Sequence, residues 1–517
     1  MTVNTPARPR GKGWLWAVVV VLVSCAGSVR AECARSCADQ VASCTATRCA
    51  GKRGPAHRLC VGECRGQAGC GGGFGTLAYV VTTCRVQGIG QIGAQELRIR
   101  RDGCDPVTVV RFANSDPVPD PAGLCALLAR NHQGYNSPIA GVFQRLGVVP
   151  DGSGVVFEIS NQFQLIGRTA LRPEEQGFFY VRSDGTGLRR LGPPSRDSTY
   201  RLFPSTQGGV GGISAAVEPE IAFSWDEKMI AYAELGPGAD GVETEQVFTL
   251  DLRTSERRQV TRLVHAAPPA HSQHAVGGGI YFASPDTIAF SHFLGEEVDR
   301  DYVRIDGTKL RSRLTPTKVG NGIEGRVVLT FGISRGGFDL LRLSLPGAPE
   351  DPDVFPGEPR NELFRVLGRD LIQLTNLHRV DTGYLSARPG AVLFEASGDP
   401  LGANPLQNCQ VFRESPYGGD LRQLTRFGQG VHSQDGCQIG DRPGCAIAPV
   451  LGENGRGSFL FYSDCDPFGT NPDGSQMFAI DWDGSPLRQL THTTGAVTAA
   501  DGSVEVEVPG PAARGGR

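Results

Sequence analysis

The chain has 517 residues, and its 51 basic and 54 acidic residues give a formal net charge of −3. Without an excess of positive charge the chain lacks the electrostatic footprint of a nucleic-acid-binding protein. Its 70 glycines and its aromatic content of 7% are typical of an all-β protein with many turns.

The N-terminus has the pattern of an export signal. Basic residues precede the apolar stretch Trp14–Val23, which is too short to cross a bilayer comfortably, and Val29-Arg30-Ala31 suits cleavage. The run Leu22-Val23-Ser24-Cys25 also fits a bacterial lipobox, in which Cys25 would carry a lipid. We therefore expect residues 1–31 to be a signal segment. The mature protein would be periplasmic, secreted or a cell-surface lipoprotein, with no other membrane attachment.

Apart from Cys25, the 15 cysteines divide into ten between Cys33 and Cys125 and four between Cys409 and Cys465. Even groups favour a disulfide framework in an oxidising compartment. Two C-x3-C pairs have helical i, i+4 spacing. Residues 32–70 are thus predicted to form a helical hairpin with the bridges Cys33–Cys64 and Cys37–Cys60, which resembles the twin C-x3-C hairpins of small disulfide-rich proteins. Zinc binding is the alternative, but the spacings contain no C-x2-C knuckle.

Residues 71–139 are predicted to be a small connector that contains strands. Leu77–Val81 and Glu96–Arg100 have strand character. Cys84 and Cys104 follow these runs at a spacing that suits a cross-strand bridge.

From about residue 140 the chain repeats a short pattern. Each copy has a β-like run, a polar turn with glycine, an Arg-rich run and a Leu-Thr ending or a close variant. The copies end at Leu191, Val260, Leu314, Leu374, Leu424 and Leu490. These end points advance by roughly 50 to 70 residues, a period that indicates propeller blades.

Each copy is predicted to be a β-hairpin preceded by a second hairpin. Asp-Gly at 184–185 and 483–484 supplies the positive φ of a tight turn, and turns such as Pro150-Asp151-Gly152 precede dense apolar strands. Two hairpins make a four-stranded sheet. Six such units between residues 140 and 494 predict an all-β, six-bladed propeller of four-stranded antiparallel blades.

Two further expectations follow from the repeat. The leucines that end the copies should occupy equivalent buried positions in the last strand of each blade: Leu191, Leu314, Leu374, Leu424 and Leu490. Residues 495–517 should be either a closing strand added to the first blade, because Val504–Val508 alternates in polarity, or a disordered tail.

The hairpin D-G-x-x-x-R-x-L-T, with its upstream P-D-G-type turn and I-A-F/Y strand, resembles the TolB-type, WD-repeat-like β-propeller repeat. The resemblance covers about two thirds of the chain and implies a fold. It does not imply TolB's role in the Tol–Pal system, because TolB carries an α/β domain where this chain has a Cys-rich module.

Four histidines are candidates for metal binding. His265, His271 and His274 lie in one connection, and His292 lies in the next strand region. Imidazole is a common metal ligand. Oligogalacturonate lyase, one class of TolB-like relative, uses histidine ligands in its propeller. The alternative is an ordinary solvated loop.

The last two units share a D-P-x-G-x-N-P loop. Its oxygen-bearing side chains, which would suit Ca²⁺, are Asp399, Asn404, Asp466 and Asn471. A rigid turn is the alternative. We expect Cys437–Cys445 to be a local bridge and Cys409–Cys465 to tie the two loops together.

These features favour a non-catalytic envelope protein, a monomer, that binds a protein or carbohydrate partner or acts as a scaffold with the propeller face. No catalytic residue is assigned and no cofactor is required, although a divalent metal is compatible with the chain. The alternative function is a metal-dependent polysaccharide lyase or hydrolase that uses the His-rich loop.

Overall fold

The computed structural model describes part of the chain, and the account below concerns that part only. The described residues are 41–53, 60–61, 64, 75–87, 90–101, 104–113, 118–119, 143–160, 171–196, 221–264, 276, 280–294, 297–308, 311–313, 326–332, 339–345, 360–367, 370–377, 383–388, 390–405, 408–427, 447–449, 458–463, 465–469, 476–484, 487–498 and 504–515.

The described residues are predominantly β-strand, with helical residues at 41–48, 60, 61 and 64 and one short 3-10 helix, η1 (Pro173–Glu175). None of the helices in this described part is long and apolar enough to cross a lipid bilayer. The prediction of a mainly β protein with a small helical segment near its N-terminus is therefore confirmed.

Six sheets of four antiparallel strands follow one another along the chain, and we number them in that order. Sheet 1 contains β5 (Phe143–Val148), β6 (Gly154–Ile159), β7 (Gly177–Arg182) and β8 (Arg189–Gly192), and sheet 2 contains β9 (Ala222–Phe223), β10 (Met229–Pro237), β11 (Glu243–Asp251) and β12 (Arg257–Gln259). Sheet 3 contains β13 (Tyr281–Ser284), β14 (Thr287–Leu294), β15 (Glu297–Arg304) and β16 (Arg311–Arg313), and sheet 4 contains β17 (Arg326–Gly332), β18 (Asp339–Leu345), β19 (Arg360–Leu367) and β20 (Asp370–Gln373). Sheet 5 contains β21 (Gly383–Arg388), β22 (Ala391–Ala396), β23 (Gln410–Glu414) and β24 (Arg422–Gln423), and sheet 6 contains β25 (Ile447–Pro449), β26 (Ser458–Ser463), β27 (Gln476–Asp481) and β28 (Arg488–Gln489).

Both ends of the chain contribute to a further sheet, the composite sheet, whose strand order is β29-β30-β1-β2-β3 with β4 paired to β2. Its strands are β1 (Thr76–Gln87), β2 (Gly90–Arg101), β3 (Val107–Ala113), β4 (Val118–Pro119), β29 (Gly495–Thr498) and β30 (Val504–Gly515). The sequence predicted six units and did not predict this sheet. The alternation at residues 504–508 does mark a strand, but that strand pairs with β1 and not with a strand of sheet 1.

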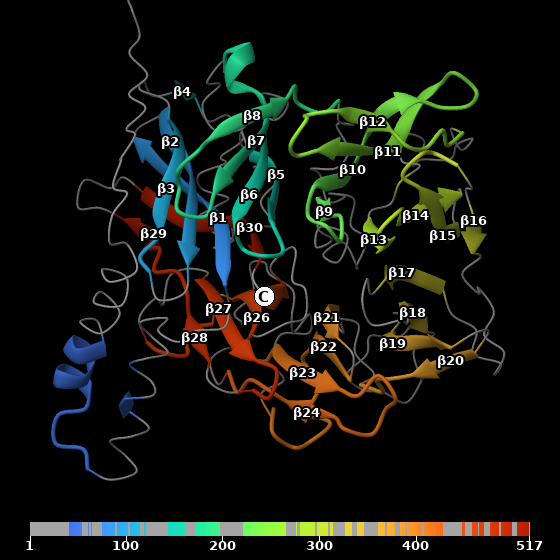
Figure 1. The fold of residues 1–517 in the computed structure, drawn as a ribbon. Coiled ribbons are helices and arrows are strands. Elements are labelled where there is room, and N and C mark those ends of the chain that lie inside the picture. Colours follow the sequence, from blue (N-terminus) through green and yellow to red (C-terminus); the bar gives the residue numbers. More distant parts are fainter. Residues whose placement is uncertain are drawn as a thin grey trace, which may run out of the picture.

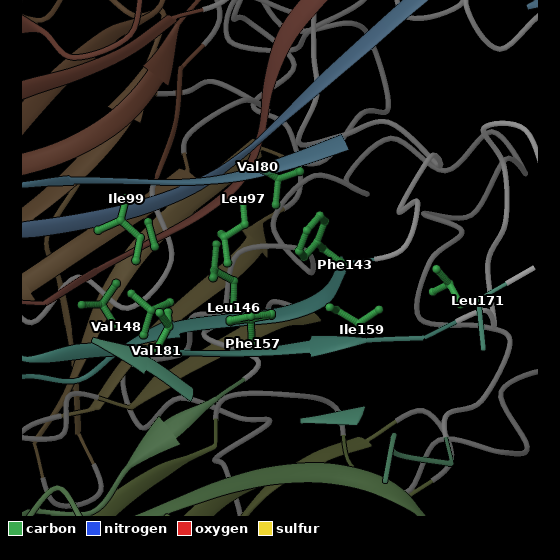
Figure 2. Close-up of a cluster of buried hydrophobic side chains, with 12 residues drawn as sticks. Val80, Leu97, Ile99, Phe143, Leu146, Val148, Phe157, Ile159, Leu171 and Val181 are labelled. Carbon is green, nitrogen blue, oxygen red and sulfur yellow. The ribbon is translucent and has the colours of Figure 1, made fainter. Parts of the chain in front are cut away.

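The sheets follow one another around a ring, and the composite sheet lies between sheets 6 and 1 (Figure 1). Apolar side chains fill the spaces between neighbouring sheets. Val80, Leu97 and Ile99 of the composite sheet point toward Leu146 and Phe157 of sheet 1 (Figure 2). Leu77 and Tyr79, on the other face of β1, pack against Leu460, Met477 and Leu490 from the last part of the ring. Burial on both faces explains why β1 is apolar from Leu77 to Val81.

The Leu-Thr endings have a structural role that recurs in sheets 2, 4, 5 and 6. The threonine Oγ1 accepts a hydrogen bond, 2.8 Å in each case, from a backbone N–H of the third strand, and it donates to a buried glutamine or glutamate at the start of that strand. The four pairs are Thr261 with Gln246, Thr375 with Glu362, Thr425 with Gln410, and Thr491 with Gln476. We call each pair a threonine clamp.

The residue before each clamp threonine extends the backbone hydrogen bonding between the third and fourth strands. The backbone N–H groups of Leu374, Leu424 and Leu490 donate at 2.7 Å to carbonyl oxygens of the third strand. Leu191 lies within β8, and Leu314 lies outside the described residues. Leu191, Leu374 and Leu490 are buried, whereas Leu424 is half-buried. The four described leucines thus lie in, or directly after, the last strand of their sheets.

Arginines of the repeat join one sheet to the next. Arg189 of sheet 1 donates to the carbonyl oxygen of Leu252, which follows β11 of sheet 2. Arg258 of sheet 2 donates in the same way to the carbonyl oxygen of Asp306, which follows β15 of sheet 3. Arginines of this run therefore connect neighbouring sheets through hydrogen bonds to the backbone.

The N-terminal module is held by two disulfides, Cys44–Cys64 and Cys49–Cys60. The expected bridges Cys33–Cys64 and Cys37–Cys60 are wrong, because Cys64 and Cys60 already have other partners. The observed bridges span 20 and 11 residues, so they close shorter loops than the expected ones and cost less chain entropy. Arg48 of the module donates to the carbonyl oxygen of Phe468 at 3.3 Å, which places the module against sheet 6.

We predict that Thr425→Val lowers the free energy of unfolding by about 1–3 kcal/mol. Valine has the same shape but leaves the Val411 N–H and the Gln410 side chain without their buried hydrogen bonds to Oγ1. Denaturant unfolding measures the effect. The control is Arg426→Gln at the exposed next position, which should change stability by less than about 0.5 kcal/mol. Equal stabilities for the two variants would contradict the role given to the clamp.

Candidate functional site

The two ends of the ring differ in their connections. At one end the second strand of each four-stranded sheet ends, the third begins, and the fourth leads to the next sheet. We call this the crossover end. The opposite end carries tight turns between the first and second and between the third and fourth strands, such as that at Asp184–Gly185, and we call it the hairpin end. The crossover end is the candidate site, because buried charged side chains gather there.

Arg145 of β5 and Glu158 of β6 form an ion pair in sheet 1 with both side chains only 1% exposed. The Glu158 carboxylate also accepts a hydrogen bond from the Ser195 hydroxyl at 2.7 Å. Ser195 follows β8, so these contacts tie the inner strands of sheet 1 to the connection that leads to sheet 2. A buried arginine is tolerated here because its charge is paired and both terminal guanidinium nitrogens, Nη1 and Nη2, donate hydrogen bonds.

The same arginine reaches across to sheet 2. Arg145 donates to the carbonyl oxygen of Ala233 at 2.8 Å, and its guanidinium lies 5.4 Å from the centroid of the Tyr232 ring. Burial raises the pKa of Tyr232 to about 12, so its hydroxyl remains protonated at physiological pH. Arg145 is therefore a polar link between the first two sheets.

Sheet 2 has its own charged group at the crossover end. The carboxylate of Glu234, 1% exposed, pairs with Arg257 of β12 and accepts a hydrogen bond from the backbone N–H of Arg196 at 2.9 Å. The Arg196 side chain forms a second, more exposed ion pair with Glu243 at 2.6 Å. Together these contacts fix the start of the connection between sheets 1 and 2.

Sheet 3 carries a histidine at this end. His292 Nδ1 lies 2.8 Å from a carboxylate oxygen of Asp301, and both side chains are nearly buried. Nε2 of the same ring is buried and has no hydrogen-bond partner among the described residues. Val276, at the end of the connection that contains the other candidate histidines, forms a β-bridge with His292.

The candidate histidines are thus only partly placed. His265, His271 and His274 lie outside the described residues, and His292 is held by Asp301. A carboxylate that fixes one ring nitrogen while the other points elsewhere is the arrangement that orients metal-binding histidines. His292 could therefore supply one metal ligand, and metal binding stays a prediction.

The first D-P-x-G-x-N-P loop has the contacts of a rigid turn. The Asp399 carboxylate accepts a hydrogen bond from the backbone N–H of Asn404 at 2.7 Å. The Asn404 amide donates to the carbonyl oxygens of Ser397 and Asn408, and its own oxygen faces the Gln410 amide at 3.3 Å. These contacts favour the turn over calcium binding. In the second loop Asp466 is buried, and Asn471 lies outside the described residues.

Cys409 and Cys465 are both disulfide-bonded and belong to the hydrophobic cluster between sheets 5 and 6. The pairing of Cys409 with Cys465 stays a prediction. The remaining candidate cysteines lie outside the described residues: Cys25, Cys33, Cys37, Cys437 and Cys445.

The sequence analysis missed the buried charges of sheets 1 and 2. Glu158 stands between Phe157 and Ile159, and Glu234 stands between Ala233 and Leu235. A single charged residue inside an otherwise apolar strand could have indicated these sites, because a buried charge requires a partner. The partners could not be found in this way, because Arg145 and Arg257 come from other strands.

No family model matches the chain, and no curated protein matches it in sequence. The solved structures to which the chain is similar share little sequence with it and have low TM-scores. TolB from Acinetobacter baumannii is 12% identical with a TM-score of 0.34, over 84% of this chain and 82% of that one. Oligogalacturonate lyase from Vibrio parahaemolyticus is 9% identical with a TM-score of 0.41, over 77% of this chain and 91% of that one. The acylaminoacyl peptidase of Pyrococcus horikoshii is 11% identical with a TM-score of 0.41, over 80% of this chain, which spans only 50% of the peptidase.

We predict that Arg145→Met lowers the free energy of unfolding by about 3–5 kcal/mol, because it leaves the Glu158 carboxylate buried without its ion pair. Thermal and denaturant unfolding measure the loss. Arg196→Gln, which breaks the exposed pair with Glu243, is the matched control and should cost less than about 1 kcal/mol.

A double variant separates the charge from the packing. Arg145→Met combined with Glu158→Leu removes both charges, so it should recover part of the stability lost by Arg145→Met alone. If adding Glu158→Leu to Arg145→Met lowers the free energy of unfolding further, the two side chains do not act as a pair.

Proposed function

We propose that the chain is a non-catalytic binding or scaffold protein that recognises a protein or carbohydrate partner with the crossover end of a β-propeller. In this proposal the six four-stranded sheets are six blades of the TolB type, and the composite sheet closes the ring between the last and the first. β29 and β30 share this sheet with β1–β4 of the same chain, which supports a monomer.

The observation that carries the proposal is the combination of a fixed charged interior with exposed apolar side chains at one end. Val242 and Val264 of sheet 2 are 48% and 54% exposed. They lie close together, since the loop between β10 and β11 approaches the backbone of Leu263 at Gly238. Exposed apolar side chains on a rigid support are suited to binding a partner, because little side-chain entropy is lost on association.

The charged residues of the crossover end support binding over catalysis. Two buried carboxylates of sheets 1 and 2 are engaged in ion pairs: Glu158 with Arg145, with a further hydrogen bond from Ser195, and Glu234 with Arg257. A general acid or base needs access to the substrate and a shifted proton affinity that suits the reaction. These pairs instead stabilise the sheets against one another.

We further propose that the protein acts outside the cytoplasm, in the envelope or beyond it. The disulfides of the N-terminal module are consistent with an oxidising compartment. The signal-like residues 1–31 and the lipobox at Cys25 would supply export and, if the cysteine is lipidated, attachment to a membrane.

A comparative pull-down with quantitative mass spectrometry tests the proposed binding surface. Immobilised wild-type protein is incubated with envelope extract, alongside Val242→Asp/Val264→Asp and the control Leu188→Asp. Leu188 is 42% exposed and lies at the hairpin end. A partner of the crossover end should be depleted at least about tenfold by the double variant, from a loss of about 1.4 kcal/mol or more, and retained by Leu188→Asp. Glycan arrays probed with the same three proteins test a carbohydrate partner. The proposal fails if only Leu188→Asp loses the partner or if neither variant does.

A metal-dependent polysaccharide lyase or hydrolase is the second candidate function, and the His292–Asp301 pair favours it. If this function is correct, the purified protein should contain a divalent metal by elemental analysis, and His292→Ala should lose that metal. His492→Ala is the control, because His492 belongs to a different part of the ring. A metal content that His292→Ala leaves unchanged would remove the support for this alternative.

A further inference from the structure

The two disulfides of the N-terminal module form one cluster of four sulfur atoms. Sγ of Cys49 lies 3.9 Å from Sγ of Cys64, although these residues are not bonded to each other. The Sγ atoms of Cys49, Cys60 and Cys64 all lie within 4.8 Å of one another, and Cys44 joins the group through its bond to Cys64. The three clustered residues are at most 2% exposed, so the sulfur atoms are shielded from water.

The separation between the two bridges is that of neighbouring sulfurs in a tetrathiolate metal site. A zinc–sulfur bond of about 2.3 Å places neighbouring sulfurs of a tetrahedron about 3.8 Å apart, close to the separation between the two bridges. The ligand spacing also fits, because C-x4-C at 44–49 and C-x3-C at 60–64 lie within the range found in structural zinc sites. The absence of a C-x2-C knuckle is therefore no obstacle for these four residues.

We propose that reduction of both bridges converts this cluster into a binding site for one Zn²⁺ held by Cys44, Cys49, Cys60 and Cys64. A dithiol supplies two electrons and two protons to each bridge and is itself oxidised to a disulfide. The four thiols release their protons as the ion binds. Two equivalents of an oxidised protein or small-molecule disulfide reverse the change: each takes up two electrons from a pair of thiolates and two protons from the solvent, the two bridges form again and the ion leaves.

The module is suited to this exchange because sulfurs dominate the interior formed by its described residues. The hydrophobic cluster of that part consists of Cys49, Cys60 and Cys64, with Cys44 and Val61 packed against them. A segment this small needs covalent bridges or a metal to remain folded. The same four residues would supply either support, depending on the redox state of the surroundings. The inference is independent of the partner proposed for the crossover end.

The test uses the full-length protein and Co²⁺ as a spectroscopic probe. After reduction by a water-soluble phosphine without oxygen, we expect the chain to bind one Co²⁺ with the intense visible spectrum of a tetrahedral thiolate complex. Equimolar Zn²⁺ should displace it, and the oxidised protein should give no such spectrum. A reduced protein without this spectrum would overturn the proposal.

Variants identify the ligands. Cys60→Ser should lose the tetrahedral tetrathiolate spectrum, whereas Cys104→Ser, at a disulfide-bonded cysteine outside the module, should keep it. Cys33→Ser/Cys37→Ser should also keep it. Its loss in that variant, or its persistence in Cys60→Ser, would show that the ligand set is wrong.

Limited proteolysis gives a second readout that does not depend on variants. Reduction of the wild-type protein should expose residues 41–64 to cleavage, and Zn²⁺ should restore their protection. Protection that is the same with and without Zn²⁺ would contradict a metal-supported fold of the module.

Discussion

The pairing of β30 with β1 is the constraint on which the rest of the ring depends. It runs from Thr76 opposite Gly515 to Val86 opposite Val504, so it joins residues that are more than 400 positions apart. This pairing joins the early and late strands of the composite sheet, whose two apolar faces come from side chains of β1 and β2. One face packs on sheet 1 and the other on sheet 6. Both sheets would otherwise expose large buried surfaces at the gap, which is costly in water.

The parts of the fold that the sequence predicted are those set by local interactions. The Leu-Thr endings were recognisable because each clamp threonine bonds a residue only 13 to 15 positions earlier. The composite sheet was not predicted, since alternation at residues 504–508 marks a strand but contains nothing that identifies its partner. The predicted disulfide pairing of Cys60 and Cys64 was wrong for a related reason. Spacing shows that Cys60 and Cys64 share a helix face, but it does not distinguish Cys44 and Cys49 from Cys33 and Cys37 as partners.

The candidate site shows the same division. The histidines were predicted as metal ligands because imidazole is a common ligand. One of them, His292, lies in a buried pair with Asp301. The charged residues that organise sheets 1 and 2 were missed, although Glu158 and Glu234 interrupt apolar strands. Their significance depends on Arg145, which reaches from β5 to the backbone of the next sheet. Such a contact depends on how the sheets pack in three dimensions. No regular spacing of residues in the sequence predicts it.

The sequence separation between β1 and β30 has a consequence for biosynthesis. A ribosome produces residues 504–515 more than 400 residues after β1, so this edge of β1 lacks its partner strand while the sheets between them are made. An open, apolar strand edge invites pairing with other chains. Until residues 504–515 arrive, this edge of β1 is open to pairing with another chain. A truncation before Val504 would leave the edge without β30 permanently.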